Sequence, residues 1–384
     1  YEDKNGNLWL AVFDFGLVKF EPGSGKFIKY ENDSRKDNSL SLNFVTCVFE
    51  DLSGVLWVGT YWGGLNKYDQ RKSKFVHFTP AVGENTLSRN VESLLKDSSG
   101  AIWVGTFSGL IRFDINANSF VNFDNLIGRN EKLTSSRIRK IVTDSYGYFW
   151  IGTIDGLVKY DTKKKTISIY KHITGDTTSI TGNLINDIYQ DSKGNLWIGT
   201  SMGLNVFDRS NNSFKTFRHN NNDSNSISNN EVLYIYEDMY DDLWLGTNWG
   251  GLNKFLPNTE SFISYHYPRL GFTTLDQILE DNQGNLWIGS YQTGLVNFDR
   301  STGAIRSITE KEGIINNTVS SMIKDNSGNL WVGTDYGLTR FNPVTNNIKN
   351  FDKNDLPFTR FLKGAIKDND GYLYFGGEGG LIMF

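Results

Sequence analysis

A chain of 384 residues can hold one large repeat domain or two ordinary domains, and 14% aromatic with 38% apolar residues favours a folded chain over disorder. A formal net charge of −4 provides no basic surface, so nucleic acid and direct membrane contact are not expected. The single cysteine excludes a disulfide framework, and no run approaches the 18 apolar residues of a membrane-spanning helix.

One sequence unit recurs along the whole chain. Its clearest copy, residues 191–208, reads Asp-Ser-Lys-Gly-Asn-Leu-Trp-Ile-Gly-Thr-Ser-Met-Gly-Leu-Asn-Val-Phe-Asp. Equivalent positions lie 43–48 residues apart, and such a fixed period is typical of a repeat architecture. Nine copies are present. The tryptophan of the unit is predicted to be structural, and Tyr374 replaces it in the last copy; it stands at Trp9, Trp57, Trp103, Trp150, Trp197, Trp244, Trp287 and Trp331.

Each unit divides into four strand-like segments, which we call A, B, C and D. In the second unit they are expected at 43–50, 55–60, 65–69 and 74–78, followed by a polar loop at 79–89. A four-stranded antiparallel unit of this period predicts an all-β fold, the β-propeller. Segment B is apolar on both faces, as expected for a blade between two neighbours, and Gly199 should leave room for the next blade. A solenoid of parallel strands is the alternative.

The repeated polar residues are expected to be structural rather than catalytic or metal-binding. One aspartate precedes each A–B turn, where its side chain can cap the turn: Asp51, Asp97, Asp144, Asp191, Asp238, Asp281, Asp325 and Asp368. The four histidines occupy equivalent places on separate units, which does not suit a cluster. Cys47 alternates with apolar neighbours and is expected to be a small core residue. The sequence therefore predicts no catalytic residue, metal or cofactor.

The B–C connections contain the informative outliers of the repeat. Because antiparallel strands alternate in direction, the B–C turns and D–A loops share one rim of a propeller. Aromatic, amide and carboxylate side chains gather there, which suits sugar rings. The alternative is that these aromatics pack against the adjacent blade or a domain interface. The candidate ligand-binding residues are Trp249, Tyr291, Gln292, Asp335, Tyr336 and Trp62; Phe107 and Asp155 occupy equivalent places.

The repeat resembles the two-component regulator propeller repeat, and all nine units match it. Segment A carries the resemblance as well, as Asn38-Ser-Leu-Ser and Asn225-Ser-Ile-Ser. The resemblance implies the extracytoplasmic sensor region of a Bacteroidetes-type hybrid two-component histidine kinase. Such proteins commonly carry two seven-bladed propellers, an immunoglobulin-like domain, a membrane span and a kinase, and many respond to oligosaccharides.

The domain division is expected to follow that pattern. Residues 356–377 depart from the frame and resemble a final blade, so residues 85–384 are predicted to form a seven-unit propeller. Residues 1–84 would be the last two units of a preceding propeller. A single ring of seven or eight blades with ragged ends is the alternative. The chain opens inside one repeat and stops inside another, so targeting signals and the span are expected outside it.

The function implied by the resemblance is ligand sensing in the periplasm, without catalysis in this region. Expected partners are an oligosaccharide or other small ligand, the downstream immunoglobulin-like domain and a second copy in a homodimer. A propeller glycoside hydrolase or lyase is the enzymatic alternative, and it would need paired carboxylates in one pocket. A protein-binding scaffold, which needs only a broad complementary surface, is the other alternative.

Overall fold

The computed structural model describes residues 1–3, 6–33, 39–50, 55–69, 76–78, 90–114, 119–126, 133, 137–265, 274–300 and 302–384. The chain forms two compact units, Tyr1–Val76 and His77–Phe384. In the described part the regular structure is β-strand except for one 3-10 turn, η2 (Phe123–Asn125), which confirms the all-β prediction. Among these residues no helix is long and apolar enough to cross a membrane.

The larger unit contains seven four-stranded sheets. In the first six, strands that follow one another in the chain are neighbours in the sheet, whereas the fourth strand of the last sheet comes from an earlier part of the chain. The strands of the first four sheets are β8 (Val91–Lys96), β9 (Ile102–Thr106), β10 (Gly109–Asp114), β11 (Ser119–Asn122); β12 (Ile138–Thr143), β13 (Tyr148–Thr153), β14 (Gly156–Asp161), β15 (Thr166–Tyr170); β16 (Ile185–Gln190), β17 (Leu196–Thr200), β18 (Gly203–Asp208), β19 (Ser213–Phe217); β20 (Val232–Glu237), β21 (Leu243–Thr247), β22 (Gly251–Leu256), β23 (Ser261–Tyr265). Those of the last three are β24 (Leu275–Glu280), β25 (Leu286–Ser290), β26 (Leu295–Phe298), β27 (Ile305–Ile308); β28 (Val319–Lys324), β29 (Leu330–Thr334), β30 (Leu338–Phe341), β31 (Ile348–Phe351); β32 (Phe361–Lys367), β33 (Leu373–Gly377), β34 (Gly380–Met383) and β7 (Val76–Phe78).

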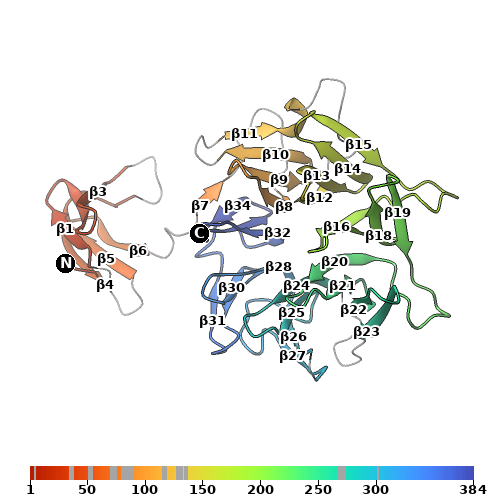
Figure 1. Ribbon diagram of the computed structural model, residues 1–384. Helices are drawn as coiled ribbons and strands as arrows, with labels where there is room; N and C mark the ends of the chain where they lie inside the picture. Colours follow the sequence, from red (N-terminus) through yellow and green to blue (C-terminus); the bar gives the residue numbers. More distant parts are fainter. Residues whose placement is uncertain are drawn as a thin grey trace. The chain divides into compact units, whose positions relative to one another are not determined.

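These seven sheets close into a ring. The first strand of each sheet contacts the first strand of the next, and β32 contacts β8. Figure 1 shows β8, β12, β16, β20, β24, β28 and β32 gathered around one centre. The short strand β7 lies beside β34 and supplies the fourth strand of the last sheet. Its residues were expected as segment D of the second unit, but they join the two ends of the ring instead.

The predicted boundary between 84 and 85 falls in residues 79–89, outside the described part. The assignment of residues 1–84 to a preceding propeller therefore stays a prediction.

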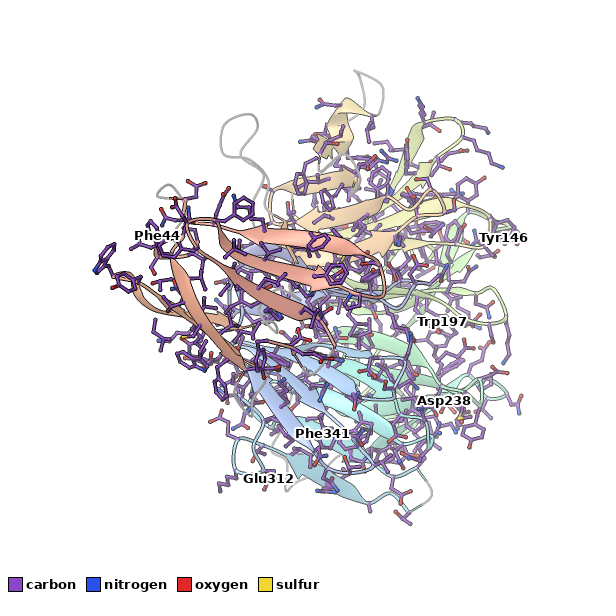
Figure 2. All side chains as sticks on the ribbon, turned by 90° about the vertical axis from the view of Figure 1, so that its left-hand side faces the viewer. Phe44, Tyr146, Trp197, Asp238, Glu312 and Phe341 are labelled. Atoms are coloured by element: carbon purple, nitrogen blue, oxygen red, sulfur yellow. The ribbon has the colours of Figure 1, made fainter. Side chains whose placement is uncertain are left out.

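Each hydrophobic cluster is shared by two neighbouring sheets. One cluster combines Trp150 and Leu157 from the second sheet with Ile185, Leu196 and Ile198 from the third, and all five are fully buried. Figure 2 shows such side chains between successive sheets, with Trp197 labelled. The hydrophobic interior therefore consists of separate layers, each between two neighbouring sheets. This explains why segment B is apolar on both faces.

The glycine after each tryptophan sets how closely two blades approach. A Cβ atom on Gly199 would lie 3.0 Å from Val232 of the next sheet, so this glycine leaves the room that was expected of it. A Cβ atom on Gly376 would lie 2.4 Å from Cγ1 of Val91. The contact between the last and first sheets thus repeats the contact made elsewhere around the ring.

We expect Gly376→Ala to destabilise the ring, because the methyl group would overpack the joint between the last and first sheets. The free energy of unfolding in urea should fall by about 1–3 kcal/mol. Gly23→Ala is the control, since no atom lies within 4 Å of the added Cβ and the residue has no positive φ. An unchanged urea midpoint for Gly376→Ala would mean that the two sheets do not pack this closely.

The smaller unit contains two three-stranded sheets, β1 (Leu8–Val12), β2 (Gly16–Glu21), β3 (Lys26–Tyr30) and β4 (Val45–Glu50), β5 (Val55–Thr60), β6 (Gly64–Asp69). They pack on one another around Trp9, which is 2% exposed. The expectation that Cys47 is a core residue was wrong, because it is exposed. The equivalent Ser93 and Asp187 are buried against a following sheet, whereas the described part of this unit places no sheet after β4–β6.

Candidate functional site

The candidate rim of the larger unit lies opposite the A–B turns. Figure 2 shows Tyr146 and Asp238, which follow strand A in their sheets, on one side of the unit and Glu312, from a D–A loop, on the other. The B–C turns lie on the same side as the D–A loops because strands B and D both end there. Two of the D–A loops that were expected to shape this rim, residues 79–89 and 267–274, lie outside the described residues except for Thr274.

Trp249 is held at the tip of a long B–C turn in a costly backbone conformation. Its φ is +58°, in the left-handed region that bulky residues avoid, and its side chain is 58% exposed. The two glycines that follow explain the turn. A Cβ on Gly250 would meet Oγ1 of Thr247 at 2.5 Å, and Gly251 has a φ of +79°. Gly250 therefore lies on the inner side of the turn, and the indole of Trp249 faces the solvent.

Tyr291 and Gln292 form the equivalent turn of the next sheet. Tyr291 is 49% exposed, and Gln292 also has a left-handed φ of +69°. The backbone N–H of Tyr291 donates to the carbonyl oxygen of Thr274 over 3.1 Å, and the Thr274 hydroxyl donates to Oδ1 of Asn248 over 2.8 Å. These bonds connect the Tyr291 turn to the turn that carries Trp249.

Asp335 and Tyr336 occupy the turn of the following sheet. Tyr336 is 66% exposed, whereas Asp335 receives a hydrogen bond from Nε of Arg360 over 3.3 Å. Arg360 also donates to Glu378, in the turn of the last sheet, over 2.7 Å. Glu378 and Asp335 both raise the pKa of this guanidinium. Sequence analysis missed Arg360 and Glu378 because they depart from the repeat in a segment whose frame is already irregular.

Two further turns of this rim hold their side chains through a neighbouring cation. Phe107 is half-buried under the guanidinium of Arg137, whose Cζ lies 4.1 Å from the ring centroid. Asp155 accepts a hydrogen bond from Lys171 over 2.7 Å. For Phe107 the expected alternative, packing against the neighbouring blade, describes the structure, since Arg137 directly precedes β12.

Trp62 lies in the smaller unit, at the equivalent B–C turn. It is 83% exposed with a φ of +69°, so the Trp-Gly-Gly sequence produces the same conformation twice. Its ring makes edge contacts with Tyr61 and Phe44, with centroids 4.6 and 6.4 Å apart.

The structure thus brings three of the predicted aromatics, Trp249, Tyr291 and Tyr336, to the B–C turns of three consecutive sheets. No ring contact joins them within the described residues. All three remain available to a ligand, and carboxylate and amide groups lie in the same turns.

The opposite rim carries the repeated aspartates, and their carboxylates are fully engaged. In the third sheet Oδ1 of Asp191 accepts the backbone N–H of Asn195 over 2.7 Å, as a turn cap does. Oδ2 accepts the indole Nε1–H of Trp197 over 2.8 Å. The Asp–Trp bond recurs at 2.7–2.9 Å in every described unit that has both residues. Asp368 receives the Tyr374 hydroxyl over 3.0 Å, and Asp51 lies outside the described residues.

We expect these aspartates to make the fold sensitive to acid. Burial alone would raise the pKa of Asp97, Asp325 and Asp368, but hydrogen bonds from side chains and backbone N–H groups outweigh it and hold each pKa below its usual value. A carboxylate with a lowered folded-state pKa stabilises the fold above its unfolded pKa, about 3.9, and this contribution is lost as the pH falls further. Urea midpoints should therefore drop between about pH 4.5 and 3. Asp325→Asn should show a shallower drop, and an equal slope in both proteins would contradict this assignment.

The histidines do not form a site in the described part of the chain. His172 and His219 each lie just after a D strand, where Nδ1 contacts a loop carbonyl oxygen at 2.9 and 2.7 Å. The side chains of His77 and His266 lie outside the described residues. The described residues contain no group of three or more His, Cys, Asp or Glu side chains that could hold a metal ion.

Comparison with known proteins identifies the repeat. Residues 132–155, 179–202, 226–249, 271–292 and 313–336 match the family model of the two component regulator propeller. Five of the nine repeats thus match the repeat of that family. Each matched segment runs through strands A and B to the B–C turn, so the motif includes the rim described above. No curated protein matches the sequence significantly.

Solved structures with the same fold include sensors and enzymes. The extracellular domains of two putative hybrid two-component systems of B. thetaiotaomicron match all of this chain at 23% and 24% identity, with TM-scores of 0.70 and 0.67. The chain spans about half of their length, 55% and 52%. Virginiamycin B lyase from Staphylococcus aureus matches 80% of this chain and 97% of its own at 12% identity, with a TM-score of 0.61. At these identities the similarity concerns the fold.

Proposed function

We propose that this chain is the ligand-sensing propeller region of an extracytoplasmic two-component sensor and that it binds an oligosaccharide at the B–C rim. The observation that carries the proposal is the exposed Trp249, held in a left-handed conformation beside the exposed Tyr291 of the next sheet. Such strain clusters at functional sites, where the surrounding structure must impose it. Exposed aromatic faces bordered by Gln292 and Asp335 suit the apolar face and hydroxyl edge of a sugar ring.

The sensor part of the proposal draws support from the two-component repeats and from the similarity to extracellular sensor domains. On this basis we place the chain in the periplasm, upstream of an immunoglobulin-like domain, a membrane span and a kinase, with a homodimer as its signalling form. Ligand binding must favour one arrangement of these domains over another if it is to signal.

We further propose that the region is not catalytic, although the lyase shows that an enzyme can have this fold. The repeated carboxylates are occupied by indole and backbone N–H groups, and Asp335 and Glu378 are held by Arg360. A hydrolase or lyase would need a free acid and base converging on the bond to be cleaved. Release of reducing ends or unsaturated products by the purified chain would contradict this part of the proposal.

We also propose that residues 1–84 belong to a second propeller. Leu65 is 65% exposed, whereas the equivalent Leu204 of the larger unit is fully buried against the next sheet. Leu8 and Leu10 on the other sheet are 38% and 42% exposed, although their equivalents Leu196 and Ile198 are fully buried. Apolar faces of this kind are normally covered, and further blades of the same protein would cover both.

The test is calorimetric titration of the chain with a panel of oligosaccharides. Loss of a stacked aromatic in Trp249→Ala or Tyr291→Ala should weaken binding by roughly 1–3 kcal/mol, by analogy with base stacking, or about 5–150-fold in Kd. Met202→Ala is the matched control, because Met202 is 49% exposed in the B–C turn of another sheet and has no ring. If a ligand binds both aromatic variants as it binds the wild type, and the variants remain folded, the B–C rim is not the site.

A further inference from the structure

The centre of the larger unit contains a small polar cavity. Its volume is about 120 Å³, and its lining comes from six of the seven innermost strands, β8, β12, β16, β20, β24 and β32. It therefore lies on the axis of the ring, and we call it the axial cavity. Arg139, Lys140 and Lys363 line it together with Glu92 and Asp187, so it is unusually rich in ionisable groups for the interior of a protein.

Most of these charges form ion pairs. Lys140 lies 2.7 Å from Oδ1 of Asp187, a carboxylate that is 2% exposed. Lys363 reaches past the neighbouring sheet to Asp276 over 2.8 Å. Each of these pairs is neutral and has short contacts, so neither needs a further counter-ion.

Arg139 is different. The carboxylate of Glu92 already receives two hydrogen bonds from Arg137, at 3.0 and 3.2 Å. Nη1 of Arg139 approaches the same carboxylate only to 3.5 Å. The side chain is 15% exposed, and its Nε is buried and makes no hydrogen bond within the described part of the chain. Arg139 therefore combines one long ion pair with a buried Nε–H that has no acceptor among the described residues.

The charge balance points in the same direction. Among the described residues four cations, Arg137, Arg139, Lys140 and Lys363, pair with three carboxylates, Glu92, Asp187 and Asp276, and Arg137 and Arg139 share the single charge of Glu92. A largely buried charge whose hydrogen-bonding capacity is not satisfied is costly. Water could satisfy the donors but would leave the charge in place, whereas a monoanion would neutralise it and accept from several donors of a planar guanidinium.

We propose that the axial cavity binds one small monoanion against Arg139. A volume of about 120 Å³ accommodates a halide or a carboxylate group with a few water molecules, since a water occupies about 30 Å³ in the liquid. The anion is either a free ion or a carboxylate that projects from a larger ligand at the B–C rim. Arg139 lies two residues beyond Arg137, which reaches that rim at Phe107, so the cavity is close enough to the rim for either source.

The first experiment measures thermal unfolding in chloride, bromide or acetate, and in gluconate at the same ionic strength, because this open-chain anion is too large to enter the cavity whole and has no sugar ring to stack at the rim. An ion that binds the folded state at ten times its Kd should raise the midpoint by roughly 2–5 °C over gluconate. Arg139→Gln keeps a donor but removes the charge, and its midpoint should not distinguish the anions. Arg112→Gln, a surface arginine outside the cavity, should respond as the wild type does.

Two outcomes would overturn the proposal. Equal midpoints of the wild type in all four anions would mean that water alone fills the cavity. If Arg139→Gln does not fold, crystals of the wild type soaked in bromide decide, and the absence of an anomalous peak beside Arg139 would exclude the site.

The second arm distinguishes the source of the anion and rests on the proposed oligosaccharide function. Galacturonate is compared with galactose. A stabilisation by galacturonate that exceeds the one given by acetate, and that is lost in Arg139→Gln, would indicate a carboxylate carried by a sugar. If acetate and galacturonate stabilise the protein equally, the anion is a free ion and the axial cavity is independent of the rim. Failure of the B–C rim to bind any sugar would leave the halide result unaffected.

Discussion

Replacing Trp197 by alanine is expected to lower the free energy of unfolding by about 3–5 kcal/mol, the range for large aromatic truncations in protein cores. Trp197 is 5% exposed and packs against Leu204 of its own sheet and Val232 and Phe255 of the next. Its indole also donates to Asp191. The substitution thus opens a cavity between two sheets and removes one of the two donors to Oδ2 of Asp191, the other being the side-chain amide of Asn195. Urea denaturation followed by tyrosine fluorescence or circular dichroism measures the loss.

Trp249→Ala provides a matched control for this prediction. Both residues are tryptophans of the larger compact unit, but Trp249 is 58% exposed and carries the strain of a left-handed φ. Surface substitutions usually change stability by no more than about 0.5 kcal/mol. If both variants lose the same free energy of unfolding, the packing of Trp197 between two sheets is not the source of its contribution to stability.

The sequence was sufficient to predict the β-propeller because every level of it repeats. The 43–48-residue period, the apolar segment around Trp197 and the glycine after it all follow from packing between identical neighbours. A position shared by nine units has one explanation, and that explanation can be read from a single copy. The exposed aromatics of the B–C turns could be identified as candidate ligand-binding residues because they differ from one repeat to the next.

What could not be predicted depends on the ends of the ring and on contacts between units. Val76–Phe78 pairs with β34 although more than 300 residues separate them, and no local pattern indicates such a partner. Cys47 looks like a core residue in its strand, and only the arrangement of sheets around it decides its exposure. Arg360 was missed because its partners, Asp335 and Glu378, come from the turns of two different sheets.

The Asp–Trp bond is the clearest contact that the sequence contained but did not reveal. The two residues are separated by six positions in every complete unit, and this constant spacing was the available signal. A turn cap explained the aspartate on its own, so nothing required a second partner for the carboxylate. The two explanations predict different effects of mutation.

Replacing Asp238 by alanine should therefore be nearly as destabilising as removing a core tryptophan. Asp238 is 4% exposed, accepts the Nε1–H of Trp244 over 2.8 Å and the backbone N–H of Tyr240 over 2.9 Å, and pairs with Arg300. Its loss would leave a buried indole and part of a buried guanidinium unsatisfied. Breaking a buried ion pair in this way costs about 3–5 kcal/mol, whereas loss of a turn or helix cap costs about 1 kcal/mol.

Asp238→Asn separates the two explanations most sharply. If the side chain only caps the turn, the amide oxygen can still accept the backbone N–H, and stability should change little. If both oxygens accept, as the structure has them, an amide oxygen that keeps the turn places the new NH₂ group against both the Trp244 N–H and the Arg300 guanidinium, and the variant should lose at least about 2 kcal/mol through unsatisfied buried donors. Combining Asp238→Asn with Trp244→Phe removes the opposing indole donor. The double variant should therefore lose less than the sum of the two single changes, and strict additivity would show that the carboxylate and the indole are not coupled.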